Sequence, residues 1–128
     1  MSQVFDPERL MKTLARRRVR FVLIGAVAAR LQGFPRMTAD TDITPARDEE
    51  NLQRLATALR DLDAKVYTES VPEGLPFDCS AESLARARMW NLITRAGRLD
   101  VVFEPSGTRG FEDLASSAVA FTVFGVDV

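Results

Sequence analysis

The chain has 128 residues, of which 46% are hydrophobic and 27% are charged; this length favours one domain with a single hydrophobic core over residues 1–128. The net charge of −1 argues against nucleic-acid binding through a wholly basic surface, and the apolar runs are too short to span a bilayer, so we expect no membrane role. One cysteine and no histidine exclude an intramolecular disulfide, a cysteine-rich zinc site and Ser-His-Asp or Cys-His catalysis.

The predicted elements begin with a helix. Asp6 followed by Pro7 is typical of an N-cap and first turn, and the apolar spacing that follows predicts a helix that ends near Arg17. This segment has acidic residues and no long apolar block, so it does not resemble a signal peptide, and we expect a cytoplasmic protein. The run "RFVLIG" then predicts a short strand buried on both faces, which ends at Gly25.

The middle of the chain predicts two more helices with a strand between them. "AVAARLQG" indicates a short helix closed by Gly33 and Pro35, and "ADTDIT" indicates the next strand. Asp48 opens a strongly periodic helix. Its apolar stripe consists of Leu52, Leu55, Ala56, Leu59 and Leu62.

The last part of the chain predicts mostly strands. "AKVYTE" indicates a strand, "SVPEGLPFDCS" a loop and "SAESLARA" a short helix. "MWNLITRAGRLDVVFE" predicts a hairpin with Ala96 and Gly97 at the turn, and with Asp100 on the face opposite Leu99 and Val101. "FEDLASSA" indicates a helical turn and "FTVFGVDV" a final strand.

This order of elements predicts an α+β fold, an α/β sandwich with a mixed β-sheet flanked by helices. Because the chain ends on an expected strand, we expect the domain to lack a C-terminal helix or extension.

Asp40 and Asp42 are candidates for a metal site. Side chains two apart on a strand point to the same face, so the two carboxylates would lie side by side and repel each other. A hard divalent cation such as Mg²⁺ or Mn²⁺ would keep both ionised. If the strand that carries Asp100 pairs with theirs, a third carboxylate joins, and three carboxylates can hold two ions about 3.5 to 4 Å apart.

Gly25 lies where a strand is expected to turn into a helix. A glycine there allows a phosphate to approach the backbone, and the helix N-terminus favours an anion. A triphosphate site beside a metal site is the arrangement expected for phosphoryl or nucleotidyl transfer.

The segments "VLIGAVAARLQGFPRMTADTDITPA" and "GRLDVVFEP" together resemble the polymerase-beta-like nucleotidyltransferase superfamily, in its minimal bacterial branch related to abortive-infection (AbiEii-like) toxins. The shared pattern is a strand, a glycine turn into a helix, Arg-x-Thr-x-Asp-x-Asp and a later strand with a third acid. The resemblance implies a nucleotidyltransferase-like fold, Mg²⁺ ions, and transfer of a nucleoside monophosphate from a nucleoside triphosphate such as ATP. It also implies an RNA (tRNA) or protein acceptor and a toxin–antitoxin or phage-defence role with a cognate antitoxin.

By this resemblance Asp40, Asp42 and Asp100 would bind the ions, and Asp100 would assist deprotonation of the attacking hydroxyl. Gly25 and Ala26 would contact the phosphates, although Ala26 replaces the glycine or serine common in the family. Arg36 would contact the triphosphate or brace the metal-binding strand.

Two rival interpretations stay open. One is a non-catalytic nucleotide- or partner-binding module on the same fold, and the other is a domain whose acidic pair binds a structural cation. Arg16, Arg17, Arg18 and Arg20 would contact RNA or, as we prefer, end a helix and face solvent.

Overall fold

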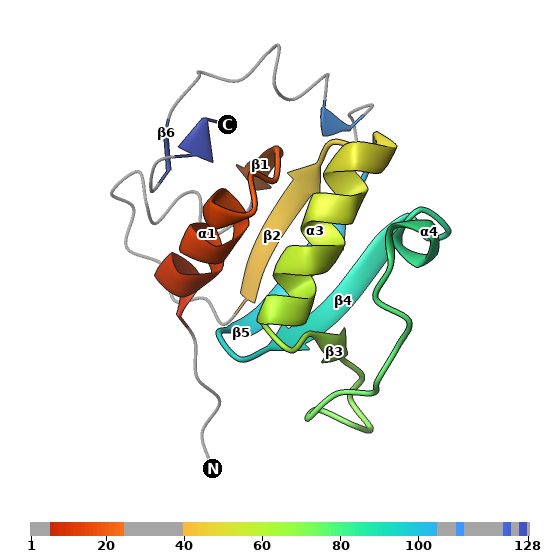
Figure 1. The fold of residues 1–128 in the computed structure, drawn as a ribbon. Helices are drawn as coiled ribbons and strands as arrows, with labels where there is room; N and C mark the ends of the chain where they lie inside the picture. Colours follow the sequence, from red (N-terminus) through yellow and green to blue (C-terminus); the bar gives the residue numbers. More distant parts are fainter. Residues whose placement is uncertain (1–5, 25–39, 105–109, 112–121, 124–125, 128) are drawn as a thin grey trace.

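The computed structural model describes residues 6–24, 40–104, 110–111, 122–123 and 126–127, and Figure 1 shows their arrangement. In chain order the elements are α1 (Pro7–Arg16), β1 (Phe21–Ile24), β2 (Asp40–Pro45), α3 (Glu49–Asp61), β3 (Lys65–Val66), α4 (Ala81–Leu84), β4 (Met89–Thr94), β5 (Gly97–Val102), β6 (Thr122–Val123) and β7 (Val126–Asp127).

A five-stranded mixed sheet forms the centre of the fold, with the strand order β1-β2-β5-β4-β3. Neighbouring strands are antiparallel except β2 and β5, which are parallel. Helices α1 and α3 lie across one face of this sheet (Figure 1). The fold class is therefore α+β with a mixed sheet flanked by helices, as the order of the predicted elements indicated.

The two long helices begin at the aspartates that the sequence pointed to. The Asp6 side chain accepts a hydrogen bond from the Arg9 N–H at 3.1 Å, and the Asp48 side chain accepts one from the Asn51 N–H at 3.1 Å. Each bond satisfies an N–H group of the first turn that has no partner within the helix. Helix α1 ends at Arg16, and all five residues of the predicted apolar stripe on α3 are buried.

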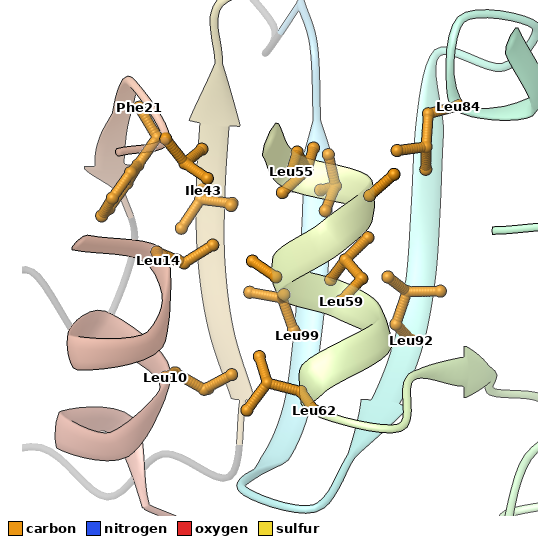
Figure 2. Packing of buried hydrophobic residues seen from close by; sticks show 14 of the residues in the cluster. Leu10, Leu14, Phe21, Ile43, Leu55, Leu59, Leu62, Leu84, Leu92 and Leu99 are labelled. Atoms are coloured by element: carbon orange, nitrogen blue, oxygen red, sulfur yellow. The ribbon is translucent and has the colours of Figure 1, made fainter. Parts of the chain in front are cut away.

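The hydrophobic core lies between the helices and the sheet. In Figure 2, leucines of α1 and α3 point toward Ile43 of β2, Leu99 of β5 and Leu92 of β4. Leu84 of α4 joins them from the side. The sheet residues that face the helices are Phe21, Leu23, Thr41, Ile43, Leu92, Leu99 and Val101, and all are buried.

The structure corrects the sequence-based prediction in three places. β3 has two residues instead of six, because the chain turns away from β4 after Tyr67 and returns at Leu75, which bridges to Val66. The hairpin turn comprises Arg95 and Ala96, and Gly97, with φ of 107°, opens β5 in a conformation that suits glycine. The final segment forms two short antiparallel strands, β6 and β7, instead of one.

The helix predicted over residues 26–33 lies outside the described residues, as does most of the helical turn predicted after residue 110. No helix in the described part of the chain is long and apolar enough to cross a membrane.

Candidate functional site

The parallel pairing of β2 with β5 brings two of the predicted site residues together. Asp42 is the register partner of Asp100, in a ladder that also pairs Thr41 with Leu99 and Ile43 with Val101. Thr41, Ile43, Leu99 and Val101 all face the helices, so alternation along the strands places Asp42 and Asp100 on the opposite face. Neighbouring strands lie about 4.8 Å apart, so Asp42 and Asp100 are neighbours on this face. The strand pairing on which the third carboxylate depended is therefore present.

Arg98 lies beside this acidic pair. It precedes Asp100 by two residues on β5 and therefore shares its face, and its Nη2 lies 3.2 Å from Asp100 Oδ1. The side chains of Arg98 and Asp100 are only 23% and 17% exposed, so this ion pair is shielded from water more than the other ion pairs among the described residues. A guanidinium so placed balances part of the negative charge of the two acids.

Tyr67 completes the surroundings of Arg98. The guanidinium carbon of Arg98 lies 3.9 Å from the centroid of the Tyr67 ring, within the range of a cation–π contact. The Tyr67 N–H donates to the Asn91 carbonyl at 2.9 Å, which holds the residue beside β4. Asn91 is in turn the register partner of Asp100. Asp42, Asp100, Asn91, Arg98 and Tyr67 thus form one group, which we call the acidic-face cluster.

The third predicted carboxylate, Asp40, begins β2 and is the register partner of Arg98. Its side chain lies outside the described part of the structure. Among the side chains that are described, no group of three or more potential metal ligands comes together. A three-carboxylate site therefore stays a prediction, and it depends on Asp40.

The other predicted site residues, Gly25, Ala26 and Arg36, lie outside the described residues, as does Thr38. The expected phosphate-binding turn thus stays a prediction. The described structure does place the end of β1 near the acids, because Ile24 is the register partner of Asp42. The residue that follows Ile24 in the chain is Gly25.

Sequence reasoning missed Arg98 and Tyr67. Arg98 received no role, although the spacing Arg-x-Asp on a predicted strand already places both side chains on one face. Tyr67 was assigned to a strand without a role. Its contact with Arg98 joins residues 31 positions apart, and no local pattern carries that information.

The basic cluster at the end of α1 has a structural role. The Arg17 guanidinium binds Asp61 with Nε–Oδ2 at 2.6 Å and Nη2–Oδ1 at 3.1 Å, and Arg20 pairs with Asp48. The hydrogen bond from Arg17 holds the pKa of the Asp61 carboxyl below its ordinary value. All four arginines are exposed, as the preferred interpretation of a helix end that faces solvent expects, and two of them also bind α3 and its N-cap.

Cys79 is not prepared for nucleophilic chemistry. Burial raises the pKa of its thiol, so the thiolate is disfavoured at neutral pH. Among the described residues, the candidates for chemistry are therefore the carboxylates on the acidic face, the face of the sheet that carries the acidic-face cluster. This agrees with the absence of histidine from the sequence.

The chain matches no model of a protein family, no curated protein and no solved structure. The resemblance to nucleotidyltransferases therefore depends on the sequence motif alone. The structural basis for a function is the acidic-face cluster.

Proposed function

We propose that the chain is a metal-dependent nucleotidyltransferase that moves a nucleoside monophosphate from a nucleoside triphosphate to a hydroxyl group of RNA or protein and releases pyrophosphate. The observation that carries this proposal is the register of Asp42 with Asp100 on adjacent parallel strands. It joins two acids that are 58 positions apart in the chain on the face away from the helices, in the order that the sequence motif requires.

The donor chemistry of this pair fits Mg²⁺ or Mn²⁺. Both cations prefer carboxylate oxygens, and neighbouring carboxylates are a common way to hold them. The Asp100 side chain keeps 17% of its surface exposed, so the site is not sealed from solvent. Asp42 and Asp100 would hold the cation, with Asp40 as the predicted third ligand.

A cation bound there would neutralise the charge of a triphosphate and favour its cleavage. The protein's own contribution is to hold the carboxylates in a fixed position on the sheet and to supply a base. Asp100 is suited to accept the proton of an acceptor hydroxyl, because carboxylates act as general bases when no histidine is present. A cognate antitoxin and a role in phage defence remain part of the proposal.

A direct test measures transfer of label from α-labelled nucleoside triphosphates to cellular RNA or protein in the presence of Mg²⁺. Asp42→Asn removes one carboxylate charge at similar volume and should abolish transfer. Asp63→Asn is the matched control, because Asp63 lies in the exposed turn after α3 and its φ of 53° is one that asparagine accepts. Transfer that survives Asp42→Asn would refute the assignment of the site.

A second candidate is the non-catalytic nucleotide- or partner-binding module. The ion pair between Arg98 and Asp100 favours it, because an internal arginine can stabilise the acids without any metal. Nucleotide binding without label transfer in the same assay would support this alternative. Cation binding without nucleotide binding would leave only a structural cation site.

A further inference from the structure

We propose that Tyr67 is a positioning residue that sets the divalent-cation affinity of the Asp42–Asp100 pair by holding Arg98 against Asp100. The inference rests on the proposed cation site and goes beyond it, because it assigns a role to two residues outside the carboxylate set. It concerns how readily the site takes up a cation.

The first step is that Arg98 competes with a divalent cation for the Asp100 carboxylate. Its Nη2 lies 3.2 Å from Asp100 Oδ1, and both side chains are mostly buried. A carboxylate that neutralises a guanidinium at this distance has less charge to offer a second cation. Arg98 and a divalent cation therefore oppose each other at Asp100.

The second step is that the surroundings of Arg98 fix its position. The Tyr67 ring covers the guanidinium at 3.9 Å from centroid to carbon, and the Nε of Arg98 is buried. On the strand beside it, backbone register places Asp40 opposite Arg98. Arginine side chains carry a large rotamer entropy, and a stacked arginine loses less of it when it binds. Stacking on Tyr67 therefore strengthens the hold of Arg98 on Asp100.

The third step is that Tyr67 is itself held in place by the backbone. Its own N–H binds the Asn91 carbonyl at 2.9 Å, and the preceding Val66 exchanges two 2.8 Å hydrogen bonds with Leu75. Gly74 allows this return of the chain, because a Cβ at that position would come within 2.5 Å of the Lys65 Cβ and 2.7 Å of the Ile93 Cγ2. β3 and its returning loop thus fix the backbone from which the Tyr67 side chain extends.

The test measures Mn²⁺ dissociation constants by calorimetry for the wild type and four variants. Arg98→Met removes the competing charge but keeps the aliphatic stem, and it should tighten binding at least about tenfold. Tyr67→Leu removes the aromatic face at similar apolar character and should tighten binding about fivefold. Tyr67→Phe keeps the face and should match the wild type.

The double variant Tyr67→Leu/Arg98→Met separates a positioning role from a general loosening of the fold. If Tyr67 acts through Arg98, the double variant should bind Mn²⁺ no more tightly than Arg98→Met alone. Equal effects of Tyr67→Leu with and without Arg98 would overturn the proposal. So would weaker Mn²⁺ binding in Arg98→Met, or no binding in any of the five proteins.

A second readout follows Tyr67 directly, since it is the only tyrosine in the chain. Biosynthetic labelling with 3-fluorotyrosine gives a single fluorine resonance. We expect Mg²⁺ to shift this resonance in the wild type, because Arg98 changes its contact with the ring when Asp100 takes up the ion. The shift should be absent in Arg98→Met, and an equal shift in both proteins would contradict the proposed coupling.

These measurements need no catalysis, so they distinguish the inference from the proposed function. The expected order of Mn²⁺ affinities without any label transfer would support the role of Tyr67 and refute the transferase. Label transfer together with Mn²⁺ affinities that do not change when Tyr67 is substituted would support the transferase and refute the role of Tyr67.

Discussion

The two faces of the central sheet use alternate residues of the same strands for different purposes. On β5, Leu99 and Val101 face the helices and are fully buried in an apolar core. Arg98 and Asp100 alternate with them along the strand, lie on the opposite face and form a charged pair. One strand therefore carries the stability of the fold on one set of residues and the candidate chemistry on the other. Substitutions at neighbouring positions should separate the two properties.

The largest expected effect lies on the helix-covered face. Leu99→Ala should lower the free energy of unfolding by about 3 kcal/mol, because it leaves a cavity between β5 and the leucines of α3. Val102→Ala, on the other face of the same strand and only partly buried, should cost about 1 kcal/mol. Urea denaturation measures the free energy of unfolding of both variants. Equal losses in the two variants would contradict the division between the faces.

A buried amide joins the helix layer to the sheet, and its removal should have the next largest effect. The Asn51 Oδ1 accepts from the Arg20 N–H at 2.7 Å, and its Nδ2 donates to the carbonyls of Arg20 and Ala46 at 3.0 and 2.8 Å. Asn51→Ala leaves three backbone groups without these bonds and should cost about 2 to 3 kcal/mol.

The control for this amide is Gln53→Ala, an exposed change on the same helix. It should alter the free energy of unfolding by less than about 0.5 kcal/mol. If urea denaturation gives the two variants the same stability, Asn51 does not anchor β1 and β2 to α3.

The sequence predicted the features that depend on local periodicity. The leucine spacing of α3 and the alternation around Asp100 each indicated the correct face, because a helix or strand imposes its own period on the side chains. The strand pairing had to be assumed, since the contact of Asp42 with Asp100 depends on residues far apart in the chain. The predicted length of β3 was wrong, because the regular pairing with β4 ends at Val66, and only the Tyr67 N–H still bonds to Asn91 of β4 before the chain turns back to Leu75.

On the acidic face, Asp100→Asn should leave the fold intact while it removes activity. Weakening the mostly buried ion pair with Arg98 should lower the free energy of unfolding by about 1 to 2 kcal/mol, less than Leu99→Ala, because asparagine can still accept a hydrogen bond from the guanidinium. Label transfer should fall on the order of a hundredfold or more, because a ligand and base of the proposed site is lost. The two quantities are measured on one preparation, by urea denaturation and by transfer of α-label.

A loss of stability as large as that of Leu99→Ala would show instead that Asp100 holds the sheet together. The acidic face would then share the structural role of the helix-covered face, and stability and chemistry would not be divided between the two faces.

The smallest expected effect concerns pH and lies within the helix layer. The hydrogen bond from Arg17 lowers the pKa of Asp61 below its ordinary value of 3.8. A carboxyl whose pKa is lower in the folded state stabilises the fold fully above its unfolded pKa, and this contribution disappears as the pH falls through the folded pKa. The wild type should therefore exceed Asp61→Asn in stability at pH 7, and the difference should shrink as the pH falls below 3.8.

Denaturation of both proteins at pH 7 and pH 3 measures this difference, with Glu73→Gln as the control. Glu73 is exposed and forms no ion pair with the other described residues. A difference between wild type and Asp61→Asn that stays constant with pH would mean that the contact between α1 and α3 does not depend on the Asp61 charge. In that case the packing of Leu10 and Leu14 against the core would hold α1 in place without help from the Arg17–Asp61 pair.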